Sequence, residues 1–197
     1  MIRHESIEDH LRRLASGDPT PGGGATGALA VAQGAGLLAM AARFSDAEGR
    51  AADAEEVIRD CLALSDGDER GFAAVAEAFD LPRDTDEERA ARSAAIQEAL
   101  QEAVRPPRGI VDAAEAVLDL AERILQEANP NVLSDVGAAL GCARAGLTAA
   151  AVTLETNLAP LRDEGLEHEV RADVERADRL TARADALVRR VREAITG

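Results

Sequence analysis

The sequence predicts an all-α protein built from long helices, and three observations support this fold class. Ala, Leu, Glu and Arg, which are good helix formers, dominate the composition. Aromatic residues, which strands favour, make up only 2% of the 197 residues. No segment alternates as a strand would, whereas apolar residues recur at helical spacing between Pro- or Gly-rich breaks. We therefore expect a single domain over residues 1–197, a bundle of long antiparallel helices with a buried Ala/Gly-rich helix.

The N-terminal part of the chain predicts a short helix followed by a buried one. Ser6 can cap a helix over Ser6–Ala15, whose apolar residues recur at helical spacing. The segment Gly17–Gly24 breaks that helix, and the following run Ala25–Phe44 is apolar nearly all round. Although this run is similar to a membrane span, it is short, rich in Gly and Ala, and carries Gln33. These features favour a buried helix in a soluble bundle, and we expect no membrane partner.

Two longer helices are predicted in the middle of the chain. Ser45-Asp46 can cap a long helix that reaches Phe79 and that Leu81-Pro82 ends. Thr85 is followed by a glutamate three residues later, which is the form of a capping box. The helix that it opens is expected to run to about Val104.

Three more helices complete the predicted bundle. Pro106-Pro107 interrupts the chain, and the helix after it runs to Ala128, where Asn129-Pro130-Asn131 forms a turn. A helix rich in small residues then spans about Leu133–Leu158. The last helix follows Pro160 and its polar neighbours, and it is highly charged on one face.

The charge balance constrains the partners and the environment. The net charge is -15, and all 22 basic residues are arginines. A GC-rich genome would favour Arg codons over Lys codons, whereas a high-salt cytoplasm would favour an acidic surface that lacks Lys. The strong acidity favours the second explanation, a halophilic source, where molar salt shortens the Debye length to about 3 Å. Nucleic acid is not expected as a partner, because its phosphates would meet a negative field.

Neither cysteine nor histidine indicates a metal site or a disulfide. Cys61 and Cys142 stand singly among apolar neighbours, so we expect buried, reduced thiols. His4, His10 and His168 show no metal-ligand spacing. The first ten residues are charged and lack the apolar core of a signal peptide, so we expect a cytoplasmic protein.

The segment Pro19-Thr20-Pro21-Gly22-Gly23-Gly24, directly before the buried helix, is the first candidate site. Three successive glycines let the backbone turn sharply and approach a ligand closely. The N–H groups at a helix start also attract anions. A tight turn between two helices is the alternative interpretation.

Polar residues on two other helices form further candidates. Asn131, Ser134 and Asp135 open a very apolar helix, where they serve either as caps or at the edge of a cavity. Asp68 lies in a long helix without a partner four residues on, whereas Asp66 can pair with Arg70. Asn157 ends the helix that Asp135 begins, about 33 Å further along its axis. Within one straight helix these two residues cannot share a site, so they would serve different ends of a ligand or a site completed by another subunit.

In this order along the chain, the residues resemble the cyclodeaminase/cyclohydrolase family of folate enzymes. The resemblance spans nearly the whole chain, and its most specific parts are the triple-glycine segment and the Asn-Pro-Asn…Ser-Asp segment. The family includes stand-alone methenyltetrahydrofolate cyclohydrolases and the cyclodeaminase domain of formimidoyltransferase-cyclodeaminase. This chain departs from the family pattern at Ala25, where a serine is usual, and at the polar segment Thr153-Leu154-Glu155-Thr156 before Asn157.

The resemblance implies a homodimer that acts on a tetrahydrofolate substrate without a metal or redox cofactor. The first expected activity is hydrolysis of 5,10-methenyltetrahydrofolate to 10-formyltetrahydrofolate. The alternatives are the formiminotetrahydrofolate cyclodeaminase reaction, which releases ammonia, and a helical folate-binding or scaffold protein that has lost activity.

The same resemblance assigns roles to the candidate residues. Asp135 is expected to be catalytic or to stabilise the cationic bridge, and Asp68 to contact the substrate, although each carboxylate suits either base chemistry or pterin recognition. The backbone of Gly22–Gly24 would cradle a polar or anionic part, with Pro21, Asn131, Ser134 and Asn157 as further binding residues. The pterin would rest on aliphatic surface or on Phe44 or Phe72.

Overall fold

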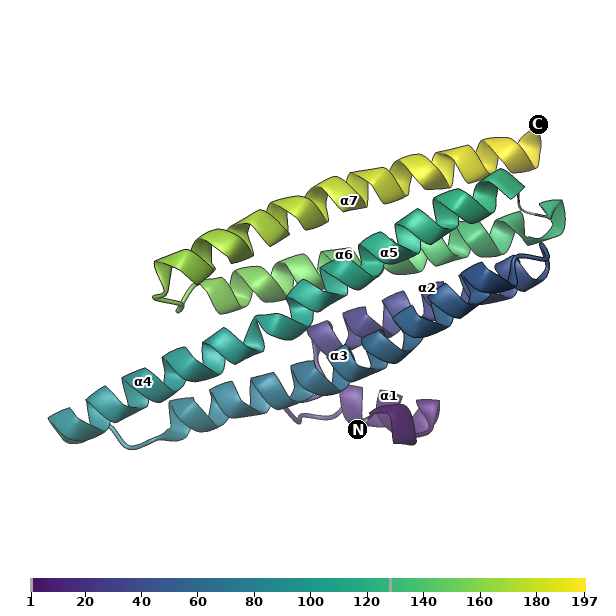
Figure 1. The fold of residues 1–197 in the computed structure, drawn as a ribbon. Coiled ribbons are helices and arrows are strands. Elements are labelled where there is room, and N and C mark those ends of the chain that lie inside the picture. Colours follow the sequence, from purple (N-terminus) through teal and green to yellow (C-terminus); the bar gives the residue numbers. More distant parts are fainter. Residues whose placement is uncertain (1, 128) are drawn as a thin grey trace.

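The computed structural model describes residues 2–127 and 129–197, and within them every regular element is a helix (Figure 1). The all-helical prediction is therefore confirmed for this part of the chain. Two short 3-10 helices, η1 (Ile2–His4) and η2 (Pro130–Val132), accompany the α-helices. The α-helices are α1 (Ile7–Leu14), α2 (Gly23–Arg43), α3 (Glu48–Asp80), α4 (Asp86–Ala103), α5 (Arg105–Glu127), α6 (Leu133–Leu158) and α7 (Glu164–Thr196).

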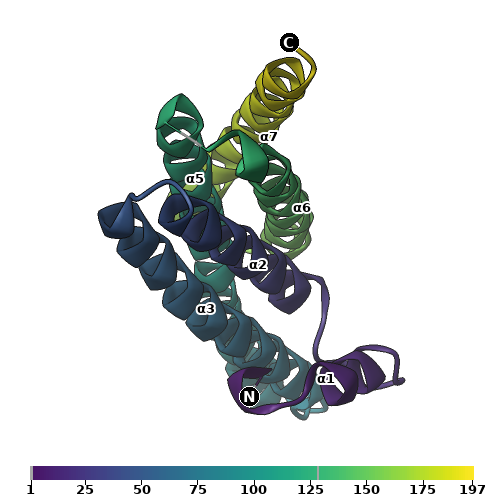
Figure 2. The same cartoon turned by 90° about the vertical axis from the view of Figure 1, so that its right-hand side faces the viewer.

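The long helices lie side by side in an elongated bundle, with α2 at its centre (Figures 1 and 2). α2 packs against α3, α5 and α6, and α7 covers the other side of α5 and α6. α4 and the C-terminal part of α3 extend beyond the remaining helices at one end. The main core is built largely from alanine, valine and leucine side chains of α2, α5, α6 and α7.

Glycines allow α2 and α6 to approach each other closely. A Cβ atom on Gly146 would lie 2.3 Å from the Val31 Cγ2 atom and 2.9 Å from the Gly27 carbonyl oxygen. Contacts this short leave no room for a side chain, so only glycine fits at this crossing. The crossing fixes the C-terminal part of α6 relative to the start of α2.

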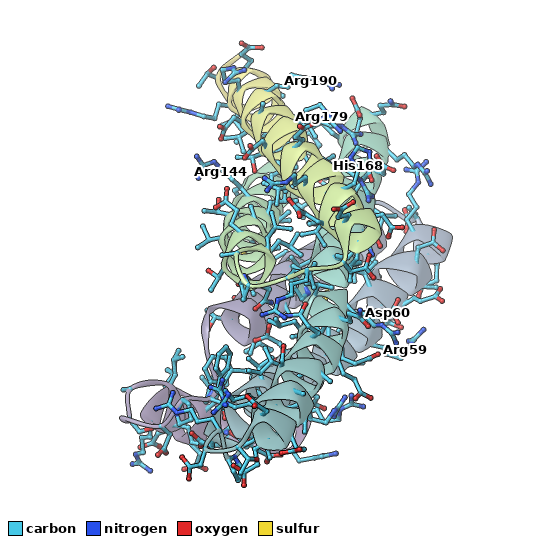
Figure 3. All side chains as sticks on the ribbon, turned by 90° about the vertical axis from the view of Figure 1, so that its left-hand side faces the viewer. Arg59, Asp60, Arg144, His168, Arg179 and Arg190 are labelled. Atoms are coloured by element: carbon cyan, nitrogen blue, oxygen red, sulfur yellow. The ribbon has the colours of Figure 1, made fainter. Side chains whose placement is uncertain are left out.

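Ion pairs join α7 to α5 along the outside of the bundle. Arg176 pairs with Asp112 at 2.6 Å, and Arg183 pairs with Asp119 at 2.7 Å and with Glu122 at 2.8 Å. Arg190 likewise pairs with Glu122, at 2.6 Å, and further charged side chains, among them Arg179, lie on the outer surface of α7 (Figure 3). The predicted charged face of the last helix thus lies partly against α5 and partly in solvent.

Two segments are long and apolar enough to cross a membrane by length and composition alone, namely Gly23–Arg43 and Pro130–Leu158. In the first, 61% of the apolar window is buried within the molecule, as in the core helix of a soluble protein. In the second, only 39% is buried. The exposed side of α6 consists mostly of small and polar residues, with Val152 as its exposed large apolar side chain.

The helix boundaries lie close to the sequence predictions, but α2 already begins at Gly23, inside the predicted break, and one predicted cap is not formed. Thr85 forms the predicted capping box, and Pro106-Pro107 lies in the first turn of α5, where a missing N–H is tolerated. The predicted Ser45-Asp46 cap of α3 is wrong, because α3 begins at Glu48 after Ala47. The Ser45 hydroxyl instead donates to the Ala41 carbonyl at 2.9 Å and accepts from the Asn129 N–H at 3.0 Å. The predicted C-terminal residue of α5, Ala128, lies outside the described residues.

The N-terminal segment is fastened to α3 through a buried carboxylate. Asp66 accepts hydrogen bonds from the Ile2 N–H and the Arg3 Nε–H, each at 3.0 Å, and its side chain is 1% exposed. The predicted pair of Asp66 with Arg70 is therefore wrong. Arg13 on α1 adds an ion pair with Glu69 on α3 at 3.1 Å. These contacts hold the chain that leads into the triple glycine against α3.

Candidate active site

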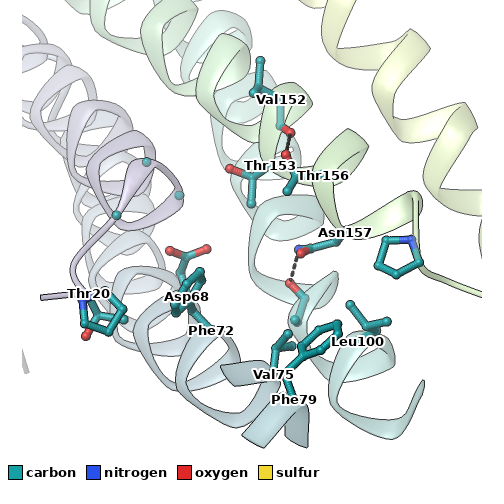
Figure 4. Close-up of a pocket in the computed structure, with 16 residues that line it drawn as sticks. Thr20, Asp68, Phe72, Val75, Phe79, Leu100, Val152, Thr153, Thr156 and Asn157 are labelled. Atoms are coloured by element: carbon teal, nitrogen blue, oxygen red, sulfur yellow. Dashed lines mark hydrogen bonds between the residues drawn. The ribbon is translucent and has the colours of Figure 1, made fainter. Parts of the chain in front are cut away.

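A pocket of about 340 Å³ lies where the start of α2, the middle of α3 and the ends of α4 and α6 meet (Figure 4). Most of its surface is apolar, with a few polar side chains, which is typical of sites for small organic ligands. It is lined by Pro19, Thr20, Gly22, Gly23, Gly24, Asp68, Phe72, Val75, Phe79, Leu100, Ala103, Val152, Thr153, Thr156, Asn157 and Pro160.

The triple glycine forms one wall of this pocket and receives the carboxylate of Asp68. The peptide bond before Pro21 is cis, and Gly22 is the N-cap of α2, where it has no side chain of its own to cap the helix. The Ala25 N–H donates to the Asp68 Oδ2 atom at 2.8 Å. The helix start thus binds an anion, as the glycine pattern indicates, and that anion is a carboxylate of the protein itself.

Gly24 makes this contact possible. A Cβ atom at this position would lie 2.0 Å from Oδ1 of Asp68 and 2.5 Å from its Cγ atom. No side chain can therefore stand at position 24 while Asp68 keeps its place. A Cβ atom added to Gly22 or to Gly23 would meet no other atom within 4 Å, so space alone does not require glycine at these two positions.

The surroundings of Asp68 shift its acidity. Burial raises the pKa of its carboxyl, and the negative charge of Glu69 raises this pKa further, whereas the Ala25 N–H opposes the shift. Among the described residues, no arginine or histidine lies within ion-pair distance of Asp68. The carboxylate is thus held by one backbone N–H and faces the pocket with its remaining acceptor capacity.

An apolar strip of α3 continues from Asp68 along the pocket. Phe72, Val75 and Phe79 follow it at intervals of one helical turn, and Phe72 and Phe79 are 50% and 45% exposed. These rings provide a surface on which a flat heterocycle can lie. Phe44, the other aromatic candidate, is 62% exposed and does not line this pocket.

The end of α6 supplies the polar wall opposite α3. The side chains of Thr153, Thr156 and Asn157 line the pocket, and the Asn157 amide donates to the Ala103 carbonyl at 3.3 Å (Figure 4). The two threonine hydroxyls donate to backbone carbonyls one turn earlier, at 2.9 and 2.8 Å. Each hydroxyl oxygen thus keeps its capacity to accept a hydrogen bond from a ligand.

The structure brings together some of the predicted site residues and separates others. Gly22, Gly23, Gly24, Asp68 and Asn157 all line the pocket. Pro21 is buried directly before the glycines and is not itself a lining residue.

Asn131, Ser134 and Asp135 do not reach this pocket, because they lie at or just before the opposite end of α6. Asn131 and Ser134 are exposed, and Asp135 is partly buried. Their roles stay predictions.

Sequence reasoning missed Val75 and Phe79 as pocket residues. Both continue the series Asp68, Phe72, Val75, Phe79, which marks a single face of the helix. That spacing was the signal that could have found them. In the described part of the chain, no three His, Cys, Asp or Glu side chains are grouped as metal ligands.

Comparisons with known proteins show which family this chain belongs to. A family model described as formiminotransferase-cyclodeaminase matches residues 6–176. The methenyltetrahydrofolate cyclohydrolase of Methylorubrum extorquens is 37% identical over 99% of this chain and 98% of its own length. The chain belongs to the formiminotransferase-cyclodeaminase family.

Two other relatives extend the comparison to a longer protein and to a solved structure. The formimidoyltransferase-cyclodeaminase of Mus musculus is 27% identical over 81% of this chain, which corresponds to 31% of that longer protein. A solved formiminotetrahydrofolate cyclodeaminase from Thermotoga maritima has the same fold, with a TM-score of 0.83 and 23% identity over the whole of this chain and 98% of that one. The Methylorubrum extorquens relative is named as a cyclohydrolase, whereas the names of these two both contain a cyclodeaminase.

Proposed function

We propose that the chain hydrolyses 5,10-methenyltetrahydrofolate to 10-formyltetrahydrofolate in one-carbon metabolism. The observation that carries this proposal is the position of the Asp68 carboxylate. It accepts the Ala25 N–H at the glycine turn and lies in a largely apolar pocket that the rings of Phe72 and Phe79 also line. A relative that is 37% identical over 99% of the chain is named as a cyclohydrolase. The proposal assigns no step to a metal or redox cofactor.

The reaction needs negative charge and a base beside the bridging carbon. The methenyl bridge is a delocalised cation, which a carboxylate stabilises in a site that excludes most water. Water adds to this carbon and gives its proton to the carboxylate, which forms a neutral hydroxyl adduct. The bond from the carbon to N5 then breaks, N5 gains a proton as the hydroxyl loses one, and the formyl group stays on N10. The carboxylic acid finally releases its proton to solvent.

Asp68 is the carboxylate that the pocket itself provides, so we assign it the contact with the bridged substrate. The threonines and Asn157 on α6 offer acceptors and donors to the polar edge of the pterin, and Phe72 offers a face for its ring. The cyclodeaminase reaction needs a proton donor for the departing nitrogen. A carboxyl whose pKa is raised by burial also suits that role, so this reaction is the second candidate.

A direct assay separates these candidates. We expect the purified chain, in molar salt, to abolish the absorbance of methenyltetrahydrofolate faster than the spontaneous reaction, with formation of 10-formyltetrahydrofolate. We expect no ammonia from formiminotetrahydrofolate under the same conditions. Ammonia release would instead establish the cyclodeaminase, and turnover of neither compound would leave a non-catalytic folate-binding protein.

An uncharged face on α2 and α6 supports a homodimer. α2 carries no charged residue before Arg43, and Thr26, Gln33 and Met40 are exposed on it at intervals of two turns. Ala138, Gly141, Ala145, Thr148 and Val152 form an exposed strip along α6. In a chain with a net charge of -15, two neighbouring uncharged helix faces suit contact with a second copy of the same surface.

This dimer would also give Asp135 a place in the site. Ser134 is exposed one turn before the first residue of this strip, and Val152 lies both on the strip and in the pocket wall. A two-fold axis through the middle of the strip would set the two α6 helices antiparallel. Ser134 and Asp135 of the partner subunit would then approach the pocket from the side that this chain leaves open.

Mixing two inactive variants tests this composite site. Asp68→Asn and Asp135→Asn homodimers should each be nearly inactive, whereas co-refolding them in equal amounts should restore about a quarter of the wild-type activity, because half of the dimers would contain one intact site. The measurement is methenyltetrahydrofolate hydrolysis before and after subunit exchange. If the mixture stays at the level of its parents although exchange is demonstrated by mass labelling, Asp135 does not complete the partner's pocket.

The remaining expectations are part of the same proposal. We infer that the chain acts as one unit over residues 1–197, in a salt-rich cytoplasm, with a folate as substrate and with neither nucleic acid nor membrane as partner. The acidic, lysine-free composition and the burial of α2 support these inferences.

A further inference from the structure

A second hollow opens directly beside the candidate active site and is rich in arginine. It shares the lining residues Phe79 and Pro160 with the first pocket, so the two adjoin at the end of α3. It lies between the α3–α4 connection, the N-terminal half of α4 and the turn from α6 to α7. Its basic lining residues are Arg83, Arg89, Arg92 and Arg162.

These arginines contrast with most others in the chain. Acidic residues outnumber basic ones by 37 to 22, and most arginines of the described residues pair with a carboxylate. In the described structure, Arg83, Arg92 and Arg162 have no carboxylate within ion-pair distance, and only Arg89 of this group pairs, with Asp86 at 2.5 Å. In so acidic a protein, three unpaired guanidinium groups in one hollow are available to a negatively charged ligand.

Hydrogen bonds hold two of these guanidinium groups in place. Arg92 donates from Nε and Nη2 to the Phe79 carbonyl at 3.1 and 2.9 Å, and its guanidinium lies 5.4 Å from the centre of the Phe79 ring. Arg162 donates from Nη1 to the Ser93 hydroxyl at 2.8 Å, and its backbone N–H donates to Gln97 at 2.8 Å. Fixing the side chains in advance lowers the entropy that a ligand must remove.

We propose that this hollow, which we call the arginine subsite, binds the γ-linked glutamate tail of the folate substrate. The inference rests on the proposed function, since it needs a folate in the neighbouring pocket. Phe79 lies eleven residues after Asp68 on α3, or about 16 Å along the helix axis. This span is comparable to the distance from the pterin to the glutamate carboxylates in an extended folate, whose aminobenzoyl group would cross the strip of Phe72 and Val75.

The form of the subsite suits a chain of carboxylates. Planar guanidinium groups bind carboxylates through two parallel hydrogen bonds, and several of them spread over one hollow match several carboxylates in series. A folate with one glutamate presents two carboxylates, and each added γ-linked glutamate presents one more. The affinity should therefore increase with tail length.

The test compares substrates of different tail length in variants matched for charge. We expect the wild type to have a KM for triglutamyl methenyltetrahydrofolate about tenfold below that for the monoglutamyl compound, at the lowest salt at which it stays folded. In Arg83→Gln/Arg162→Gln, the ratio of the two KM values should fall toward one. Arg59→Gln/Arg189→Gln removes the same charge from exposed positions outside both pockets, and should retain the wild-type ratio.

A binding measurement keeps this test independent of turnover. We expect aminobenzoyl-triglutamate, which lacks the pterin, to bind the wild type in calorimetry and to bind the Arg83→Gln/Arg162→Gln protein several-fold more weakly. If neither folate is turned over but this difference persists, the proposed function fails and the subsite stands. Three results would each overturn the subsite. The first is an equal KM of the wild type for both tail lengths, and the second is a loss of the KM ratio in the Arg59→Gln/Arg189→Gln control as well. The third is an affinity for inorganic phosphate equal to that for aminobenzoyl-triglutamate.

Discussion

The Asp68→Asn variant is expected to lower kcat/KM for methenyltetrahydrofolate by about 10²- to 10⁴-fold, the range found when a general base is removed. The amide oxygen of asparagine can still accept the Ala25 N–H bond that Asp68 accepts at 2.8 Å, so the glycine turn should keep its form. What is lost is the negative charge beside the cationic bridge and the acceptor for the proton of water. The loss should therefore fall on turnover more than on folding.

Asp60→Asn is the matched control, because Asp60 is an exposed carboxylate on the same helix and does not line the pocket. It should keep wild-type kinetics. The measurements are initial rates from the methenyl absorbance, together with circular dichroism and thermal unfolding of each variant. Full activity in a folded Asp68→Asn protein would show that this carboxylate is not the catalytic group.

The pH dependence provides a second readout of the same residue. Since burial raises the pKa of Asp68, its ionised form is lost at a higher pH than for an ordinary aspartate. The rate should fall as the pH drops through this raised pKa, and the acid limb should disappear from the residual activity of Asp68→Asn.

The same shift affects stability. A folded-state pKa above the unfolded value means that the contribution of this carboxyl to stability is present at low pH and is lost as the pH rises through the folded pKa. Above the folded-state pKa the ionised, half-buried Asp68 therefore costs stability, and there Asp68→Asn should unfold at the same temperature as the wild type or a higher one. A lower unfolding temperature of Asp68→Asn than of the wild type would indicate that the Asp68 carboxylate stabilises the folded state instead of destabilising it.

Local signals account for the parts of the molecule that the sequence could predict. The helices could be placed because proline, glycine and capping residues act within a few positions, as at the Thr85 capping box. Asp68 could be singled out because its neighbour four residues on is Phe72, so no local partner explained it. The triple glycine indicated a close backbone approach, and the Asp68 carboxylate makes that approach at Gly24.

The features that could not be predicted depend on partners distant in the sequence. Asp66 bonds to Ile2, 64 positions away, and this interaction replaces the local pair with Arg70. Ser45 binds the N–H of Asn129 rather than capping α3, since the two turns meet only in the folded bundle. The role predicted for Asp135 stays a prediction, because within one copy of the chain Asp135 lies at the end of α6 opposite the pocket.

Among substitutions that add one methyl group to the site, Gly24→Ala should lower stability and activity the most. The added Cβ would stand 2.0 Å from Oδ1 of Asp68, so the carboxylate must leave its place or α2 must shift away from α3. Overpacking of this kind costs about 1–3 kcal/mol of stability. Displacing a catalytic group by about 1 Å can lower the rate by about 10²-fold.

Gly23→Ala is the natural control, because a Cβ there meets nothing within 4 Å and alanine favours the helix. A double-mutant cycle then identifies the cause of the damage. The three atoms nearest the new Cβ all belong to the Asp68 carboxyl group, which Asp68→Ala removes. In this background the stability cost of Gly24→Ala should therefore disappear. Chemical unfolding of the four proteins measures this coupling. A cost that persists without the carboxylate would mean that position 24 requires glycine for a reason other than its contact with Asp68.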